Sequence, residues 1–353
     1  MKTETLTITH FNPETATEAE FEKATRIQLE SFKENNPNDP LPPEHLIRKQ
    51  MEMIASHPIY HLNIYFAETA ERELSGGLIT LEGKPDSEDY DNQKHMGMLL
   101  PIILPDFRRR GFGTQLLRSG VEALRQNEEV TLIQGESNRD EGRAFAQKFG
   151  ASIAIESRDN RAYVKDIDWA MVEQWASDGE KANPDVTIER YKGLPGDDDM
   201  EAYSQLYTAV FNQQPFEELE GLETTWTPER LRENHERMQK VSAIHHGMFT
   251  REANGDLSGM TEMAYNSERP HRIGQGLTGV QENYRGRGLG KWLKAKMLLY
   301  MRDNFTEVEH IATTNAASNA AMLSINERLG FKVYKHNTMY KIPIEELATK
   351  LGI

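Results

Sequence analysis

The stretch NYRGRGLGKWLKAKML, Asn283 to Leu298, combines three alternating glycines with a concentration of Arg and Lys. It follows a predicted strand at 272–281 and opens a predicted helix at 288–303. A turn of this kind presents unpaired backbone N–H groups at the positive end of the helix dipole. Glycines let a ligand approach the backbone closely, and the basic side chains add charge. The stretch therefore predicts a site for phosphate or pyrophosphate.

The same turn occurs earlier in the chain. The segment DFRRRGFGTQLL at 106–117 has the frame of ENYRGRGLGKWL at 282–293. Two further pairs keep the same order at nearly the same spacing: LTITHF from Leu6 with VTIERY from Val186, and QKFGASIAI around Gly150 with ERLGFKVY around Gly330. Three collinear matches predict that the chain contains two copies of one domain.

The repeats suggest how the chain is divided. We expect a first domain at 1–167, a linker at 168–185 and a second domain at 186–353. The linker contains a predicted helix at 168–180, followed by GEKANPD, whose Gly and Pro are typical of connections. Each copy is expected to have an α/β fold with a mixed sheet. Two short closing strands are expected in each copy, at 151–156 and 161–167 and at 331–335 and 338–343.

The composition excludes several classes of protein. The 353 residues carry a formal net charge of -15, so we expect no general binding to nucleic acid or to a membrane surface. Because the chain has no cysteine, disulfides, thiolate metal sites and a cysteine nucleophile are excluded. No metal-ligand spacing is apparent, and we expect no metal. The polar start MKTETLTITHF and the lack of a long apolar run predict a cytoplasmic protein.

Other phosphate-binding patterns fit the turn less well. A P-loop requires G-x-x-x-x-G-K-[ST], which is absent. A dinucleotide-binding fold requires G-x-G-x-x-G after its first strand, whereas RGRGLGKWL has G-x-G-x-G after a later one. A nucleotide-binding enzyme is therefore the weaker alternative. A basic helix N-terminus without a ligand is the other, and the presence of two equivalent turns weakens it.

The spacing R-x-x-G-x-G occurs at Arg108 and again at Arg285. It resembles the [QR]-x-x-G-x-[GA] signature of the GCN5-related N-acetyltransferases, or GNAT superfamily. The segment NAASNAAMLSINERLGF, Asn315 to Phe331, is similar to the second cofactor segment of that family. Both copies resemble the family, so the resemblance covers nearly the whole chain and implies a tandem two-domain protein.

This resemblance implies a fold and a reaction. The expected fold is a splayed mixed sheet flanked by helices, with acetyl-CoA in the gap between two parallel strands. The amine of a small molecule or a peptide would attack the thioester directly in a ternary complex, so no covalent nucleophile is required. The chain would be a monomer, as a pseudo-dimer of two domains, or a homodimer. A non-catalytic acyl-CoA-binding protein with two CoA sites stays open as an alternative.

The resemblance also implies which residues contact the cofactor. The turn would hold the pyrophosphate, and the backbone N–H at the end of the entering strand would polarise the thioester carbonyl. In the second copy the candidates are Val280, Arg285, Gly286, Arg287, Gly288, Leu289, Gly290, Lys291, Asn315, Asn319 and Asn326. In the first copy they are Ile103, Arg108, Arg109, Arg110, Gly111, Phe112, Gly113 and Thr114.

The two copies differ in the residues expected to take part in chemistry. Asn319 falls at the place of the family's pantetheine-contacting Asn, where the first copy has Arg139. The position of the usual general acid, a Tyr, is Asn326 in the second copy and Ala146 in the first. We therefore expect the second copy to be the catalytic domain and the first to bind CoA without a clear catalytic role.

Three residues are candidates for proton transfer. Glu262, in SGMTEMAY, is the candidate base, and Ile79 occupies its place in the first copy. The alternative for Glu262 is an edge-strand carboxylate that faces water or pairs with an Arg. Tyr334 and Tyr340, on the closing strands, are candidates for the acid that protonates the thiolate. The alternative for both tyrosines is packing in the core, as for many strand aromatics.

Overall fold

The computed structural model describes residues 4–219 and 224–353. These residues form two compact units: unit 1 takes 4–155, 218–219 and 337–353, and unit 2 takes 156–217 and 224–336. Each unit has a mixed sheet flanked by helices and contains one of the two glycine turns. The predicted α/β fold with two tandem copies is confirmed.

Unit 1 contains the first copy's sheet. Its strand order is β1-β2-β3-β4-β5-β12, and only β4 and β5 are parallel. The strands are β1 (Thr7–Phe11), β2 (Tyr60–Glu68), β3 (Leu74–Gly83), β4 (Met96–Ile103), β5 (Leu132–Ser137) and the second part of β12 (Lys332–Pro343). The helices are α1 (Glu18–Asn35), α2 (Glu44–Ala55), α3 (Tyr90–Gln93), α4 (Phe112–Leu124), α5 (Asp140–Lys148) and α11 (Ile344–Leu351), with the short η1 (Pro105–Phe107) in the glycine turn.

Unit 2 repeats this arrangement. Its strand order is β6-β11-β10-β9-β8-β7, and only β10 and β11 are parallel. The strands are β6 (Ser152–Tyr163), β7 (Thr187–Lys192), β8 (Ala243–Arg251), β9 (Leu257–Asn266), β10 (Arg272–Val280) and β11 (His310–Ala316). The helices are α6 (Trp169–Ala182), α7 (Asp197–Asn212), α8 (Pro228–Lys240), α9 (Leu289–Asn304) and α10 (Ala320–Arg328), with the short η2 (Val164–Asp166) and η3 (Glu282–Tyr284).

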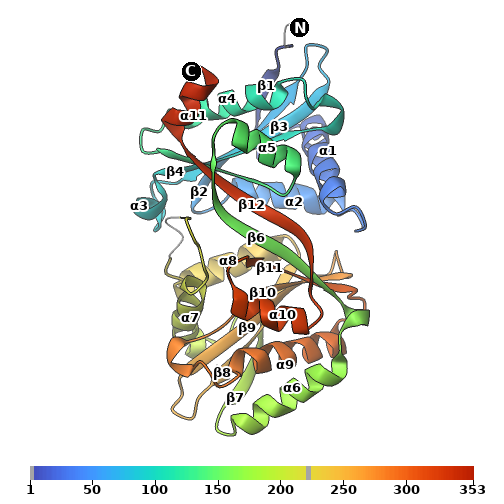
Figure 1. Ribbon diagram of the computed structural model, residues 1–353, viewed down its shortest axis with the longest axis vertical. Helices are drawn as coiled ribbons and strands as arrows, with labels where there is room; N and C mark the ends of the chain where they lie inside the picture. Colours follow the sequence, from blue (N-terminus) through green and yellow to red (C-terminus); the bar gives the residue numbers. More distant parts are fainter. Residues whose placement is uncertain (1–3, 220–223) are drawn as a thin grey trace. The chain divides into compact units, whose positions relative to one another are not determined.

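The expectation of two short closing strands in each copy is wrong. Each expected pair is one long strand, β6 or β12, which begins in one unit and ends in the other (Figure 1). The polar segments at 157–160 and 336–337 were expected to turn, but they contain neither Gly nor Pro and stay extended. Residues 338–343 of β12 pair with β5 in unit 1, and residues 157–163 of β6 pair with β11 in unit 2. Each unit therefore completes its sheet with a strand from the other half of the chain.

The C-terminal helix α11 belongs to the core of unit 1. Leu347 and Leu351 are buried in the same cluster as Leu116 and Val121 of α4. The α4 residue Arg118 donates to the Leu351 carbonyl at 2.6 Å. Unit 2 has separate clusters on its two faces, one around α9 and one around α7. The segment expected to be a linker, 168–185, consists mostly of α6 and lies in unit 2.

In both units the two parallel strands part after a short paired stretch. Residues 272–274 of β10 pair with 310–312 of β11, and residues 96–98 of β4 pair with 132–134 of β5. Beyond these stretches the strands separate toward the glycine turn. Strand β10 also bulges against β9 between Gln275 and Thr278, whereas β4 pairs with β3 without a break. The two units thus share a splayed sheet but differ at its centre.

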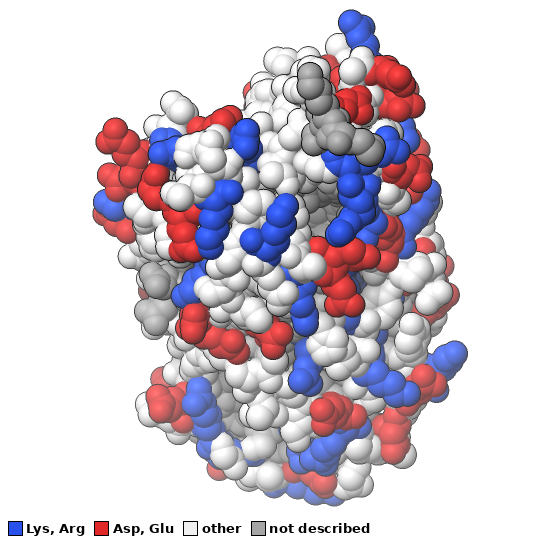
Figure 2. Space-filling view, turned by 45° about the horizontal axis from the view of Figure 1, so that its top comes forward, with Lys and Arg blue, Asp and Glu red and all other residues white. Residues whose placement is uncertain are grey.

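The surface carries charges of both signs. On the face drawn in Figure 2, Lys and Arg side chains are interspersed with Asp and Glu side chains. Within the described residues, no helix has the length and apolar character needed to cross a membrane. In the same part of the chain, no three His, Asp or Glu side chains gather into a metal-binding group.

Candidate functional site

The glycine turn of unit 2 is open. Gly286 and Gly288 have φ of 81° and 79°, in the left-handed region that favours glycine, and Gly288 is the N-cap of α9. A Cβ atom placed on either glycine would meet no atom within 4 Å. A Cβ on Gly290 would touch only Val280, at 3.6 Å. Because the first N–H groups of a helix lack acceptors within it, this open turn can receive an anion.

The basic side chains of this turn have different environments. Arg285 donates from Nε to the Val280 carbonyl at 3.4 Å, and no carboxylate among the described residues pairs with its guanidinium. Arg287 instead forms an ion pair with Glu252 at 2.9 Å and donates to Asn183 at 3.2 Å. Arg285 is therefore the arginine whose charge remains for a ligand, whereas Arg287 fastens the turn to the rest of unit 2.

Lys291, in the first turn of α9, lies over an aromatic ring. Its Nζ is 5.2 Å from the centre of the Trp175 ring, and the guanidinium of Arg328 lies 4.5 Å from the same centre. Leu289 is buried in a small cluster with Val186 and with Trp292 of α9, and Val280 packs against this cluster. These contacts fix the direction of α9 as it leaves the turn.

The turn of unit 1 has the same backbone but carries its own counterion. Gly111 has φ of 85°, and Arg109 has φ of 62° where unit 2 has a glycine. Arg108 donates two hydrogen bonds to Glu34 of α1, at 2.8 and 2.6 Å, and Arg139 donates a third at 2.6 Å. The hydrogen bonds from Arg108 lower the pKa of the Glu34 carboxyl. A carboxylate of the protein thus pairs with Arg108, the counterpart of Arg285 in this turn.

The remaining first-copy residues also have partners within unit 1. Arg110 donates to the Asp106 carbonyl at 2.8 Å, and the Thr114 N–H donates to the Gly111 carbonyl at 3.2 Å. Phe112 is buried in the core, and the Ile103 carbonyl accepts a hydrogen bond from Arg108 at 3.0 Å. A Cβ on Gly113 would lie 3.5 Å from the ring of Phe145, a residue of α5. Gly113 therefore has an aromatic neighbour, Phe145, where Gly290 of unit 2 has Val280.

The Asn segment of unit 2 forms part of a buried polar chain. The Asn319 side chain caps α10 by accepting from the Met322 N–H at 3.2 Å. Asn326 is 1% exposed and donates to Asn315 of β11 at 2.8 Å. Its carbonyl oxygen accepts from Lys294 Nζ at 2.5 Å. These hydrogen-bonded side chains link α9 through α10 to β11, beyond the point where β10 and β11 separate.

Lys294 is a candidate that the sequence analysis missed. It is 2% exposed, and burial alone lowers its pKa to about 7. The signal was present in the sequence. With helical periodicity, Lys294 shares one face of α9 with Met297 and Met301, both of which are buried, so a lysine interrupts an apolar stripe.

Glu262 lies on β9, on the face covered by α7. It is 7% exposed, so the alternative of a carboxylate facing water is wrong. Its Oε1 accepts from the Tyr207 hydroxyl at 3.3 Å, and its carboxylate also accepts from the Leu277 N–H at the bulge of β10. Burial raises the pKa of Glu262, and the electrostatic interaction with His245 partly offsets this rise. A buried carboxyl with a raised pKa and few partners is suited to accept a proton.

Two more tyrosines surround this carboxyl. The Tyr191 and Tyr203 hydroxyls are hydrogen-bonded to each other, and both rings are buried. Tyr191 passes over Gly247, the cross-strand partner of Glu262, and a Cβ on that glycine would clash with the ring. Burial is the main reason that the pKa of each of the three tyrosines, Tyr191, Tyr203 and Tyr207, is raised well above the usual value. The nearby charge of Glu262 raises it further. They therefore remain neutral hydrogen-bond donors.

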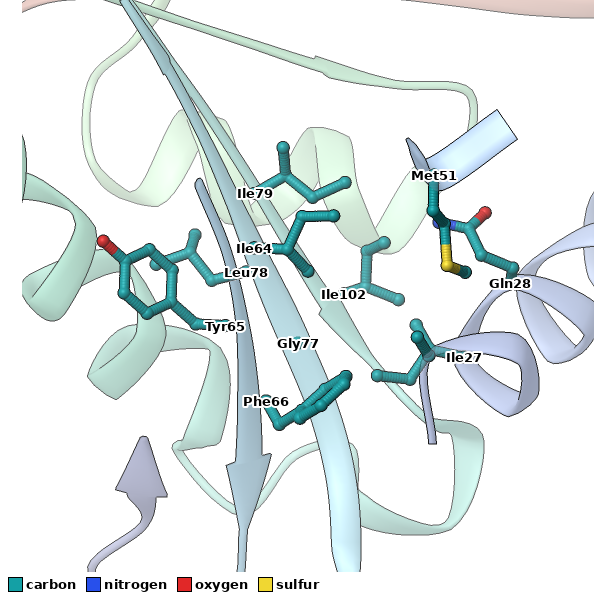
Figure 3. Close-up of a pocket in the computed structure, with 11 residues that line it drawn as sticks. Ile27, Gln28, Met51, Ile64, Tyr65, Phe66, Gly77, Leu78, Ile79 and Ile102 are labelled. Carbon is teal, nitrogen blue, oxygen red and sulfur yellow. The ribbon is translucent and has the colours of Figure 1, made fainter. Parts of the chain in front are cut away.

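The equivalent place in unit 1 is apolar. Gly76 faces the end of β4 as Gly259 faces the end of β10, so the registers place Ile79 where Glu262 lies. Figure 3 shows Ile79 at a small cavity with side chains from α1, α2 and the neighbouring strands. The cavity has a volume of about 20 Å³, room for about one water molecule. Its lining is Ala24, Ile27, Gln28, Met51, Ile64, Tyr65, Phe66, Gly77, Leu78, Ile79 and Ile102, none of them charged.

The two candidate acids belong to different units. Tyr334 lies in unit 2, half-buried, with the guanidinium of Arg161 3.5 Å from the centre of its ring. Tyr340 is buried in unit 1, where it pairs with Gly135 of β5. The long strand β12 separates them, because it leaves unit 2 after residue 336. The structure therefore does not bring Glu262, Tyr334 and Tyr340 together within one unit.

Comparison with known proteins identifies the fold. Residues 207–331 match the sequence profile of the Acetyltransferase (GNAT) family. No curated protein matches the sequence of this chain. A tandem GNAT protein from the clavulanic acid biosynthesis pathway is similar in structure, with a TM-score of 0.73 and 17% identity over 96% of this chain and 99% of the other.

Two further solved structures show the same likeness. A GCN5-related N-acetyltransferase from Sphaerobacter thermophilus has a TM-score of 0.66 and 14% identity, over 96% of both chains. A glucosamine N-acetyltransferase region in a fungal multi-domain GH3 β-N-acetylglucosaminidase has a TM-score of 0.67 and 13% identity. That match covers 96% of this chain and 38% of the other. Residues 207–331 thus match the GNAT family in sequence, and the chain as a whole has the fold of tandem GNAT proteins.

Proposed function

We propose that this tandem GNAT protein is an acetyl-CoA-dependent N-acetyltransferase and that its chemistry takes place in unit 2. One observation carries the proposal: the unit with the open glycine turn is also the unit with a buried carboxyl, Glu262. In unit 1 Arg108 of the turn is paired with Glu34, which also binds Arg139, and Ile79 replaces the carboxyl. The features required for binding and for proton transfer therefore occur together in one unit.

The open turn fits a CoA pyrophosphate. Its two left-handed glycines leave space over the backbone, and Arg285 supplies a charge that no carboxylate of the described residues neutralises. Residues 286–291 would hold the phosphates through their N–H groups, and Val280 would lie beside the thioester. Acetyl-CoA supplies the activated acyl group when it is bound. The residues of the turn bind and orient it.

The acceptor is proposed to be a primary amine of a small molecule or a peptide. Glu262 would accept the proton that the nitrogen of the attacking amine must lose, and the Tyr207 hydroxyl would hold the carboxyl in place. One structural neighbour is described as a glucosamine N-acetyltransferase region, and we include amino sugars among the candidate acceptors on that basis. The chain's net charge of -15 favours a cationic acceptor in general.

The test is a thiol-release assay with acetyl-CoA and a panel of amines that includes amino sugars, polyamines and peptide N-termini. We expect release above the hydrolysis background with at least one amine, and loss of that release in Glu262→Gln. A thermal-shift measurement should show stabilisation by CoA and none by ATP or NAD. Binding of CoA without transfer to any amine would favour the non-catalytic alternative, and stabilisation by ATP alone would overturn both.

A further inference from the structure

Lys294 occupies a core position that its counterpart fills with an apolar side chain. The first copy has Leu117 at this place on α4, and Leu117 is buried in the core of unit 1. Ala146 stands where unit 2 has Asn326. A lysine at such a site costs free energy, because an ammonium loses its hydration on burial. Leu117 shows that an apolar side chain fills this place in the fold.

The partners of Lys294 are neutral. Its Nζ donates to Asn326 at 2.5 Å and lies 3.6 Å from the Met322 sulfur and 5.6 Å from the centre of the Phe331 ring. No carboxylate of the described residues forms an ion pair with it. Several charged side chains of the surrounding elements contact other residues: Lys291 and Arg328 lie on the Trp175 ring, Arg161 lies on the Tyr334 ring, and Lys296 pairs with Glu180. Three others, Arg158, Glu327 and Lys332, line a cavity next to Asn326.

The neighbouring cavity adjoins the hydrogen-bonded side chains of Lys294, Asn326 and Asn315 at Asn326. It has a volume of about 250 Å³, and Asn326 is part of its wall, together with Asn160. Asn326 therefore contacts the lysine on one side and borders the cavity on the other, so that one side chain separates Lys294 from this space. The pKa of about 7 means that both forms of Lys294 are accessible near neutral pH.

We propose that Lys294 takes up a proton when acyl-CoA binds to unit 2, and that the resulting ammonium acts through Asn326 as a positioning group for the sulfur that leaves. The inference rests on the proposed function. Lys294 lies on α9, whose N-terminus forms the phosphate turn, so bound phosphates place negative charge near its amine and favour the protonated form. The family's usual Tyr position is Asn326, and Lys294 is the group that holds it.

The transfer balances without an external reagent. The bond from the carbonyl carbon to the amine nitrogen forms, and the bond from that carbon to sulfur breaks, leaving the electron pair on sulfur. The attacking amine is neutral, and Glu262 receives the one proton that its nitrogen loses as the amide forms. The Lys294 ammonium stabilises the negative sulfur electrostatically and keeps the Asn326 amide oriented, with its N–H pointing to Asn315. Lys294 is thus a positioning residue, which acts through Asn326.

Calorimetry of acetyl-CoA binding, without an acceptor, tests the inference. Titration at pH 8 in HEPES and in Tris, whose ionisation enthalpies differ, gives the number of protons taken up on binding. We expect an uptake approaching one proton per bound acetyl-CoA at pH 8, and much less at pH 6, where Lys294 is already protonated. Lys294→Met should abolish the uptake. Lys296→Met removes a charge from the exposed side of the same helix and should leave the uptake unchanged.

The outcomes separate the inference from the proposed function. Binding with the same proton number in the unsubstituted protein and in Lys294→Met, or proton release, would overturn the inference and leave the proposed function standing. No binding of acetyl-CoA by the unsubstituted protein would overturn both. If Lys294→Met does not fold, the pH dependence of uptake in the unsubstituted protein decides the question.

Two further variants test the positioning role. Lys294→Arg carries a charge that does not titrate near neutral pH, so it should bind acetyl-CoA without proton uptake and lose the pH dependence of kcat that Lys294 contributes. Asn326→Ala should keep the proton uptake but lower kcat more than it changes KM, because the amide through which Lys294 acts on the leaving sulfur is then missing. Equal kcat in Asn326→Ala and the unsubstituted protein would contradict a role transmitted by Asn326.

Discussion

Arg108 is bound by Glu34 through two N–H···O bonds of 2.8 and 2.6 Å, at the place where Arg285 of unit 2 has no carboxylate partner among the described residues. A bidentate pair of this kind has the geometry with which an arginine recognises a phosphate or a carboxylate. The Glu34 carboxylate therefore stands where a ligand's charge would be required. The two turns have nearly the same backbone, but the arginine of unit 2 is available to a ligand and that of unit 1 is paired within the protein.

The first prediction is that the chain binds one CoA, in unit 2. Gly288→Val and Gly111→Val place the same side chain at φ of 79° and 85°, so both variants should lose similar stability, about 1–2 kcal/mol. Only Gly288→Val should weaken CoA binding, by at least about tenfold, or about 1.4 kcal/mol. Calorimetric stoichiometry and affinity are the measurements. Two CoA molecules per chain, or equal loss of affinity in both variants, would contradict the assignment.

The second prediction concerns the charge of Arg285. Arg285→Gln keeps a donor for the Val280 carbonyl but removes the charge, so CoA affinity should fall by roughly threefold to tenfold and depend less on salt. Arg108→Gln is the matched control. It should leave CoA affinity unchanged and lower the stability of unit 1, because it breaks the bidentate pair with Glu34. Affinity measured between low and high salt in the three proteins distinguishes these effects.

The third prediction follows from the exchanged strands. Leu347 lies in α11, after β12, and is buried in the core of unit 1. Leu347→Ala should therefore destabilise unit 1 by about 2–5 kcal/mol and speed amide exchange in β4 and β5. Leu298→Ala, in the core of unit 2, should speed exchange in β10 and β11 instead. Faster exchange in β10 and β11 of Leu347→Ala would show that the C-terminal segment belongs to unit 2.

The sequence predicted the fold where a local pattern decides it. The two turns, their strands and their helices follow from glycine positions and repeat spacing, and the structure has them at those places. The sheet with which β12 pairs could not be predicted in this way. The strand mixes apolar and polar residues without a strict alternation, and nothing local tells which sheet will pair with residues 338–343. Pairing over 200 residues of separation depends on which edge is free once each unit has folded.

The site shows the same limit. Glu262 was a candidate because it stands among apolar residues on a predicted strand, and its replacement by Ile79 in the other copy can be read from the aligned repeats. The closure of the unit 1 turn depends on Glu34 from α1, which is distant in sequence from Arg108, and no local motif marks it. Lys294 could have been found from the sequence, since it interrupts an apolar helical face and stands at the position equivalent to Leu117 in the first copy. The missed residues are those whose role depends on a contact between elements.

The fourth prediction is a pH-dependent gain of stability in Lys294→Met. Burial lowers the pKa of Lys294 from 10.5 to about 7, so the unfolded chain binds a proton that the folded chain does not bind between these values. The cost of burying the lysine is absent above the unfolded pKa, grows as the pH falls, and is complete below about 7. Lys294→Met should therefore raise the free energy of unfolding by up to about 4 kcal/mol at pH 6 and by much less at pH 10.

Denaturant unfolding at the two pH values measures this difference. Lys296→Met, which changes a partly exposed lysine paired with Glu180, should alter stability by less than about 1 kcal/mol at either pH. An equal effect of Lys294→Met at pH 6 and pH 10 would mean that Lys294 titrates in its ordinary range. A loss of stability would mean that its hydrogen bond to Asn326 outweighs the burial of its charge.

The last prediction separates catalysis from stability at Glu262. Burial raises the pKa of this carboxyl, so its ionisation costs stability as the pH rises from the usual Glu range to the raised value in the folded protein. Glu262→Gln keeps acceptors for the Tyr207 hydroxyl and the Leu277 N–H but carries no charge. It should therefore be more stable than the unsubstituted protein at pH 8, and the difference should vanish near pH 4. Turnover should fall by about 10²–10⁴-fold, because the amine loses its proton acceptor, while CoA affinity stays nearly unchanged.

Tyr207→Phe is the matched change for this site. It removes the hydroxyl that donates to Glu262 at 3.3 Å but keeps the ring and the carboxyl, so it should reduce turnover by less than Glu262→Gln does. Its pH profile should shift upward, because the carboxylate loses a donor and its pKa rises further. If Glu262→Gln retains full turnover with an acceptor that the unsubstituted protein acetylates, Glu262 is a structural carboxyl and the proton leaves the amine by another route. A variant that gains stability at pH 8 and loses turnover would instead show that this buried charge is maintained at a cost to the fold because the reaction requires it.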